Sequence, residues 1–209
     1  MTELSSAQIE SAIRPYHVPI GPGMADKIRA YVSLLLKWNR TISLTTVTDP
    51  TEILKFHFGE SLFSISELKF GGSRLADVGS GAGFPGFPLA MAVPALDVVL
   101  IESNARKCAF LSEVKRDLQL SNVTVFRGRM EDFPAAPPKF DFITARAIGH
   151  HDELLAWARK HLSADGKIVL WIGDEDVREI SLVPHWNWEK SILIPGSERR
   201  YLLAGSPSI

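Results

Sequence analysis

The sequence predicts an α/β protein in which strands and helices alternate around a mostly parallel sheet. Two observations support this fold class: short apolar segments recur through residues 74–173, and segments with helical spacing of apolar residues separate most of them. Strands joined by helical crossovers run parallel, with helices on both faces of the sheet. The 209 residues, 45% of them hydrophobic, are enough for a sizeable core and give no sign of disorder.

The expected elements follow one another along the chain. Five strands are expected at residues 74–79, 97–102, 123–128, 140–146 and 167–173. Helices are expected near residues 86–92, over about 104–119 and after residue 146. The segment 186–205 holds two apolar stretches around a Pro-Gly-Ser turn and has no helical pattern between them. It therefore predicts a closing hairpin, with an antiparallel last strand.

The first 70 residues have a different pattern from the rest. Apolar residues at helical spacing predict one helix over residues 24–38 and a second over residues 51–68. No alternating strand pattern interrupts this region. We therefore expect residues 1–70 to form a helical extension of an α/β domain at residues 71–209, the two making a single compact unit.

Composition excludes several classes of protein. The 23 basic and 24 acidic residues give no global charge that would indicate nucleic acid or membrane binding, although a local patch could still bind RNA. The single cysteine, Cys108, excludes a disulfide framework and a zinc knuckle. The polar N-terminus and the short apolar stretches predict neither a secretory signal nor a membrane span. The expectation is a cytoplasmic monomer without a metal.

The strongest motif is the glycine-rich segment DVGSGAGFPG at residues 77–86, directly after the first strand. Glycines allow positive φ and close approach of a ligand to the backbone, and the helix that follows offers free N–H groups to an anionic group. We therefore expect Gly79, Gly81 and Gly83 to line a cofactor. Glu102, about 20 residues on at the end of the second strand, is placed to accept hydrogen bonds from ribose hydroxyls.

Two cofactor patterns fit this segment. Residues 81–86 match the dinucleotide pattern G-x-G-x-x-G, and residues 77–83 match the adenosylmethionine pattern D-x-G-x-G-x-G. Asp77 at the strand end can attract a cationic methionine amino group, whereas Pro85 is awkward in a pyrophosphate turn. Together with the closing hairpin, this favours adenosylmethionine. A nicotinamide cofactor, and glycines that serve only packing, remain the alternatives.

Further candidates follow the third and fourth strands. Met130 and Glu131 are placed to border an adenine, although acidic residues here also suit a helix N-terminus. Arg146 ends the fourth strand and is expected to contact cofactor or substrate, with a surface ion pair as the alternative. Phe84 is a candidate for lining the transferred methyl group or the acceptor base, and it suits the core equally well.

Four segments together are specific to one bacterial family: KWNR at 37–40 with Leu44-Thr45, Asp49-Pro50 with His57, DVGSGAGFPGFPLA at 77–90, and TARA at 144–147. They resemble the glucose-inhibited division protein B family (GidB, also called RsmG) over about residues 27–205. The resemblance implies a class I, Rossmann-like methyltransferase: a mostly parallel seven-stranded sheet with an antiparallel last strand and an N-terminal helical extension. It also implies S-adenosyl-L-methionine as donor and a guanine N7 of 16S rRNA in the small ribosomal subunit as acceptor. The cofactor contacts of the family fall on Gly79, Phe84, Met130, Glu131 and Arg146.

The sequence departs from the family at two places. Glu60-Ser61 stands where Asp-Ser is usual, and Ile172-Gly173 stands where Lys-Gly is common. On that side the chain therefore lacks the lysine cation that the family offers to RNA or to transition-state charge. A methyltransferase of a small molecule or a protein, and a catalytically weak ribosome-assembly factor, are therefore kept as alternatives.

The expected chemistry needs no catalytic acid or base. The N7 lone pair of guanine is free in the ring plane and loses no proton, so alignment is the main task, with Phe84 and Arg146 as candidate contributors. RNA phosphates are expected at basic residues. The candidates are Lys37, Arg40, Arg129, Arg199 and Arg200.

Overall fold

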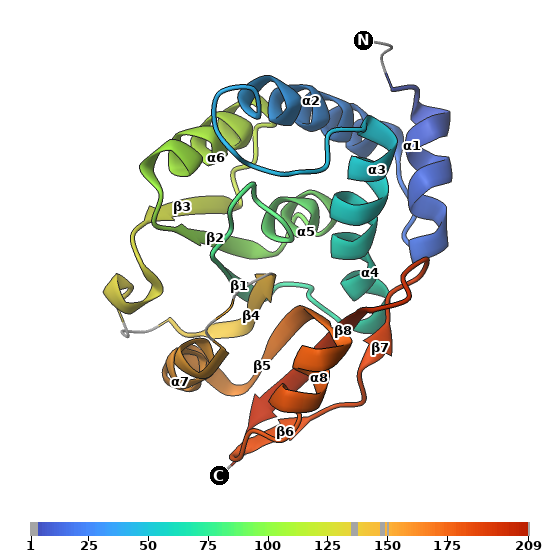
Figure 1. Ribbon diagram of the computed structural model, residues 1–209. Helices are drawn as coiled ribbons and strands as arrows, with labels where there is room; N and C mark the ends of the chain where they lie inside the picture. Colours follow the sequence, from blue (N-terminus) through green and yellow to red (C-terminus); the bar gives the residue numbers. More distant parts are fainter. Residues whose placement is uncertain (1–3, 135–137, 147–148, 150, 209) are drawn as a thin grey trace.

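The computed structural model describes residues 4–134, 138–146, 149 and 151–208, and shows one sheet of eight strands in this part of the chain (Figure 1). The strands are β1 (Arg74–Val78), β2 (Asp97–Glu102), β3 (Val123–Arg127), β4 (Phe140–Arg146), β5 (Leu162–Gly173), β6 (Trp186–Trp188), β7 (Ile192–Leu193) and β8 (Arg200–Pro207). Their spatial order is β3-β2-β1-β4-β5-β8-β6, with β7 paired to β8.

Strands β1 to β5 are parallel, and β8 runs antiparallel to β5, β6 and β7. The predicted α/β fold with an antiparallel last strand is confirmed. The sheet has eight strands rather than seven, because residues 186–194 form two short strands instead of one. The polar run Glu189-Lys190-Ser191 separates β6 from β7.

Helices cover both faces of the sheet. They are α1 (Ser6–Ile13), α2 (Pro22–Trp38), α3 (Pro50–Ile53), α4 (Glu60–Glu67), α5 (Gly86–Ala92), α6 (Ala105–Asp117), α7 (His151–His161) and α8 (Asp174–Ile180). Figure 1 shows α1–α4, in blue to cyan, on the same side as α5 and α6, whereas α7 and α8 lie below them. Alternate residues of the strands point to the two faces, so Leu75 packs with the first group of helices and Ala76 with the second.

The N-terminal region contains one more helix than the sequence predicts. Helix α1 begins at a capping box, in which Ser5 accepts from the Gln8 N–H and the Gln8 side chain accepts from the Ser5 N–H. Residues 50–67 form a continuous helical segment, but its middle, Leu54–Gly59, is a π-helical turn. Helix α8 was not expected either.

Tyr31 of α2 joins the helical extension to the glycine-rich loop. Its fully buried ring lies 5.2–5.6 Å, between ring centroids, from the rings of Phe58, Phe84 and Phe87, and its hydroxyl donates to the Ala82 carbonyl. Aromatic pairs at these separations add to the stability gained by burial. Residues before and after position 70 therefore share one hydrophobic core.

We expect Gly59→Ala to destabilise the protein by about 1–3 kcal/mol, because overpacking forces neighbours out of place. A Cβ atom at Gly59 would lie 2.2 Å from the ring of Tyr16, which is buried against the π-helical turn. Chemical denaturation measures the free energy of unfolding. Gly71→Ala is the control, because a Cβ atom there would meet nothing within 4 Å; equal stability of the two variants would contradict this packing.

Candidate cofactor-binding site

The glycine-rich loop leaves β1 with a backbone that requires glycine. Gly79, Gly81 and Gly83 have φ values of 68°, 57° and 87°, which L side chains rarely adopt. The N–H groups of Gly79 and Ser80 donate to the Ile101 carbonyl of β2 at 2.9 and 3.1 Å. The loop is thereby fixed against the neighbouring strand.

Asp77, near the end of β1, binds the end of this loop and the neighbouring strand β4 through its side chain. The carboxylate is 1% exposed and accepts from the Gly86 N–H at 3.2 Å and from the Thr144 hydroxyl at 3.0 Å. Burial raises the pKa of Asp77 to about 7. The side chain thus ties the start of α5 to β4; the direct contact with a methionine amino group stays a prediction.

A cavity of about 260 Å³ opens beyond the carboxyl ends of β1, β2 and β3. It is lined by four of the residues expected to bind a cofactor, Gly79, Glu102, Met130 and Glu131. The sheet order places β1 between β2 and β4, and open α/β sheets bind ligands where the strand order reverses in this way. The positions of these four residues therefore suit a bound nucleoside.

Other residues of this cavity were not expected there. Arg129, which we predicted as an RNA contact, lines it together with Ser103, Gly128 and Glu153. Ser103 and Gly128 directly follow β2 and β3, so the rule that ligands bind at the ends of the strands could have found them. Glu153 comes from α7, and nothing in the sequence pattern pointed to it.

Glu102 is held in place from two directions. Its carboxylate accepts from the Gly81 N–H at 2.9 Å and from the Asn104 N–H at 2.8 Å. The residue is 7% exposed and lines the cavity. A carboxylate fixed at the end of β2 is what recognition of a ribose diol requires.

Phe84 lies in the aromatic cluster around Tyr31. It is 8% exposed, stacks on Tyr31 at an interplanar angle of 5°, and has the His57 ring 4.8 Å away. His57 Nε2 lies 2.7 Å from the Thr45 hydroxyl, and burial lowers the pKa of His57 to about 4. The imidazole is therefore neutral near pH 7.

Arg146, at the end of β4, belongs to a charged group that we call the Glu60 cluster: Glu60, Arg146 and Arg200. Arg146 Nη2 donates to Glu60 Oε2 at 2.8 Å and to the Phe56 carbonyl at 2.7 Å. Arg200 Nε donates to Glu60 Oε1 at 2.7 Å, and its guanidinium lies 4.8 Å from the centroid of the Phe56 ring. Arg200, predicted to bind RNA, is therefore paired with a carboxylate, although its side chain is 42% exposed.

The other basic residues predicted to contact RNA are exposed. Lys37 lies in the last turn of α2, with its Nζ 4.0 Å from Glu113 Oε1, and Arg40 lies two residues beyond the end of this helix. Arg199 immediately precedes β8, and Arg129 lies on the rim of the cavity described above. These positions leave the cations accessible to a phosphate backbone.

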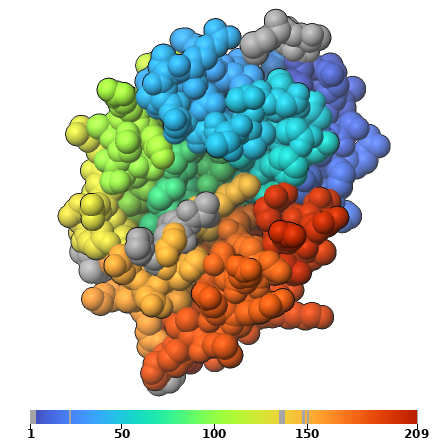
Figure 2. Space-filling model, viewed as in Figure 1, coloured from blue at the N-terminus to red at the C-terminus, as the bar shows by residue number. Residues whose placement is uncertain are grey.

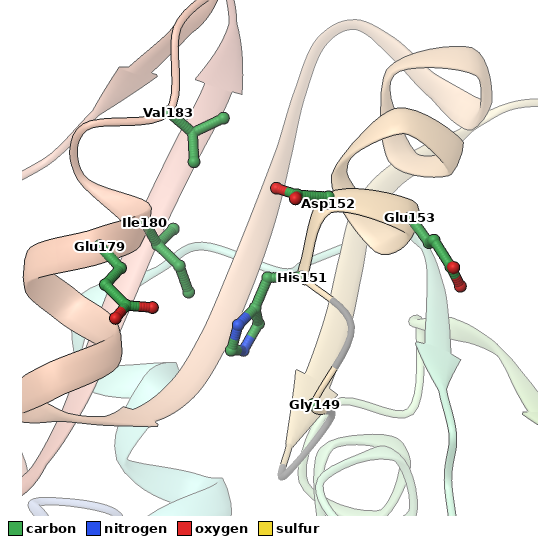
Figure 3. Close-up of a pocket in the computed structure, with 7 residues that line it drawn as sticks. All are labelled: Gly149, His151, Asp152, Glu153, Glu179, Ile180 and Val183. Atoms are coloured by element: carbon green, nitrogen blue, oxygen red, sulfur yellow. The ribbon is translucent and has the colours of Figure 1, made fainter.

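A second cavity, of about 360 Å³, lies between α7 and α8 (Figure 3). Its polar lining includes His151, Asp152, Glu153 and Glu179, and Figure 3 shows Glu153 turned away from the other side chains. The described residues that line this cavity include three carboxylates and no lysine or arginine, so it is poorly suited to phosphate. Among the described residues no three His, Cys, Asp or Glu side chains are grouped to hold a metal ion, and no helix is long and apolar enough to cross a membrane.

We expect Asp77 to contribute less to the free energy of unfolding as the pH rises from about 4 to about 7. The folded state keeps the Asp77 proton up to about pH 7, whereas an unfolded aspartate loses it near pH 4. Across this window the folded state binds more protons, so the free energy of unfolding decreases as pH rises, by up to roughly 1.4 kcal/mol per pH unit.

The measurement is the difference in free energy of unfolding between the wild type and Asp77→Asn, followed from pH 4.5 to pH 7.5. We expect this difference to decrease steadily and to level off above about pH 7. The exposed Asp97→Asn change is the control. A difference between wild type and Asp77→Asn that is independent of pH would show that Asp77 is ionised throughout.

Comparison with known proteins gives the family. The family model described as GidB, rRNA small subunit methyltransferase G, matches residues 24–189. The Ribosomal RNA small subunit methyltransferase G of Chromobacterium violaceum is 35% identical over 181 residues, covering 87% of this chain and 86% of the relative. The protein of the same name from Escherichia fergusonii is 32% identical over 205 residues, covering 96% and 98%.

Solved structures agree on the fold. A ribosomal protein L11 methylase from Lactobacillus delbrueckii subsp. bulgaricus superposes with a TM-score of 0.62 at 16% identity, covering 74% of this chain and 80% of that one. A precorrin-6y C5,15-methyltransferase from Geobacter metallireducens superposes with a TM-score of 0.57 at 16% identity, covering 79% and 91%. The match of the family model over most of the chain, and the identity to its members, show that this protein belongs to the GidB family of methyltransferases.

Proposed function

We propose that this protein transfers a methyl group from S-adenosyl-L-methionine to N7 of a guanine in 16S rRNA of the small ribosomal subunit. The observation that carries the proposal is the cavity that joins Gly79, Glu102 and Met130 at the strand ends of a GidB-family chain. The relatives named rRNA small subunit methyltransferase G support the choice of substrate. The protein is proposed to act in the cytoplasm as a monomer, without a metal.

The residues of the cavity fit the parts of this cofactor. The Glu102 carboxylate is fixed where it can accept from both ribose hydroxyls, and Met130 and Glu131 border the space for the adenine. The left-handed glycines at 79, 81 and 83 let the methionine part approach the backbone. Arg146 is not among the residues that line this cavity, but we propose that it contacts the cofactor from the end of β4, because its Nη1 is buried and has no hydrogen-bond partner among the described residues.

The reaction requires positioning rather than proton transfer. When bound, the cofactor supplies a methyl group activated by a positively charged sulfur. Because the N7 lone pair is free and no proton leaves, the chain needs no general base. The residues have to hold the acceptor nitrogen in line with the methyl group. Proximity and orientation of this kind accelerate a reaction between two bound molecules. The aromatic ring of Phe84, at the end of the glycine loop, is proposed to border the acceptor base.

RNA is proposed to contact the exposed basic residues on the two sides of the site. The candidates remain Lys37, Arg40, Arg129, Arg199 and Arg200. Ile172, which stands where the family commonly has lysine, is 7% exposed and packs with the core on the α7 and α8 face. We propose that Arg200, which pairs with Gly173 on β8, and Arg199, just before that strand, supply the positive charge that a lysine at position 172 would give.

The first prediction is transfer of labelled methyl from S-adenosyl-L-methionine to small subunits that lack N7-methylguanine. The label is expected at a single guanine, mapped by cleavage at the modified base. Arg146→Ala is expected to lose most of the activity. If the protein binds the cofactor but transfers no label to the small subunits, rRNA is not the substrate. A small-molecule substrate or a role in ribosome assembly would then be favoured.

A second prediction concerns the ribose contact. Glu102→Gln removes the charge while keeping the size of the side chain, so we expect S-adenosyl-L-methionine to bind about tenfold more weakly, as for other hydrogen bonds to charged groups. Isothermal titration calorimetry gives the dissociation constant. Glu189→Gln is the matched control and should bind normally, because Glu189, just after β6, pairs with Lys167 of β5 and is not among the residues that line the cavity. If Glu102→Gln binds S-adenosyl-L-methionine with wild-type affinity, the ribose does not contact Glu102.

A further inference from the structure

Three parts of the chain that are distant in sequence meet at one buried carboxylate. Glu60 begins α4 and its side chain is 1% exposed, and it pairs with Arg146 of β4 and Arg200 of β8. Figures 1 and 2 show the red C-terminal strands directly against the cyan helical segment that holds Glu60. The two guanidinium groups approach different oxygens: Arg146 lies at Oε2 and Arg200 at Oε1.

The Glu60 cluster carries more positive than negative charge. Arginine stays protonated at neutral pH, so two cations share one carboxylate. Tyr16 lies close enough to interact with all three groups, but burial raises its pKa to about 12, so its phenol is neutral and adds no negative charge. Without the negative charge of Glu60, the guanidinium groups of Arg146 and Arg200 would repel each other.

Arg146 is held on one side only. Its Nη2 is engaged by Glu60 and by the Phe56 carbonyl, whereas Nη1 is buried and lacks a hydrogen-bond partner in the described part of the chain. A buried N–H without an acceptor is costly, and such groups in native proteins usually have a partner that is missing from the structure. The free edge of the guanidinium is therefore the one that a ligand can complete.

We infer that Glu60 is the positioning residue that holds Arg146 with this free edge turned to the ligand. The inference rests on the proposed function, in which Arg146 contacts the cofactor. Glu60 acts through Arg146, whose orientation it fixes by a charge-assisted hydrogen bond in a low-dielectric setting. Arg200 binds Oε1 of Glu60, so Oε2 is the oxygen that remains for Arg146.

The length of the glutamate side chain matters as well as its charge. The Trp171 indole N–H donates to the backbone carbonyl of Glu60 at 2.7 Å, which anchors the start of α4 to β5. With the backbone anchored, an aspartate at this position would draw the carboxylate back by about 1.5 Å, the length of one carbon–carbon bond. It would keep the charge but could not reach both arginines at hydrogen-bond distance.

The test compares Glu60→Gln, Glu60→Asp, Arg146→Ala and the double variant Glu60→Gln/Arg146→Ala. The readouts are the dissociation constant of S-adenosyl-L-methionine, kcat and KM for methyl transfer, and Tm without ligand. We expect affinity to fall more than tenfold in Glu60→Gln and about three- to tenfold in Glu60→Asp. In the Arg146→Ala background, Glu60→Gln should change the affinity less than twofold, because residues that act through one another are not additive.

The control is Glu113→Gln. Glu113 also accepts from a distant side chain, the Trp38 indole at 3.1 Å, but it does not pair with Arg146. If Glu60 contributed to stability alone, its variants would have a lower Tm, and the folded protein would still bind S-adenosyl-L-methionine with wild-type affinity. We expect that result for Glu113→Gln.

Wild-type affinity in folded Glu60→Gln, or equal effects of Glu60→Gln with and without Arg146, would overturn the inference. If Glu60→Gln does not fold, wild-type affinity in Glu60→Asp overturns it instead. If the wild type itself binds no S-adenosyl-L-methionine, or if Arg146→Ala binds it normally, the proposed function or its use of Arg146 fails and the inference falls with it.

Discussion

The reversal of strand order at β1 is the constraint on which the rest of the molecule depends. Because β1 lies between β2 and β4, the chain winds outward in both directions from one strand, and α5 and α6 cover one face while α7 covers the other. The carboxyl ends of β1, β2, β3 and β4 then meet at one edge of the sheet. Residues as far apart in sequence as Gly79 and Met130 reach the same cavity without any loop having to travel far.

The glycine loop works only because its surroundings hold it. Asp77 bonds the start of α5 from below, the Ile101 carbonyl bonds two of the loop N–H groups, and Tyr31 packs on the outer side. Tyr31 comes from the helical extension, so α2 is part of the support of the loop rather than a separate cap. This arrangement follows the usual logic of binding sites, in which a rigid outer layer fixes the groups that touch the ligand.

Much of the fold and part of the site could be predicted from the sequence. The apolar patterns predict β1 to β4 to within one residue, whereas β5 begins at Leu162, five residues before the predicted start at 167. Of the residues expected to bind a cofactor, Gly79, Glu102, Met130 and Glu131 line the cavity. The missed helices α1 and α8 have eight and seven residues, too few for a periodic pattern to stand out. The pairing of Glu60 with Arg200 joins positions 140 residues apart, which no local pattern can reveal. The sequence therefore predicts Arg200 as an RNA contact without revealing its pairing with Glu60, and it predicts Arg129 as an RNA contact although Arg129 lines the cavity.

The place of β8 in the sheet has a consequence for how the protein is made. This strand is synthesised after all the others, yet it pairs with β5 in the interior of the sheet and carries Arg200 to Glu60. A chain emerging from the ribosome can form the β1–β4 region and the glycine loop early, but β5 keeps an open edge until residues 200–207 arrive. Until then the Glu60 side chain has only one of its two arginine partners, Arg146, so the Glu60 cluster is completed only when the last strand pairs with β5.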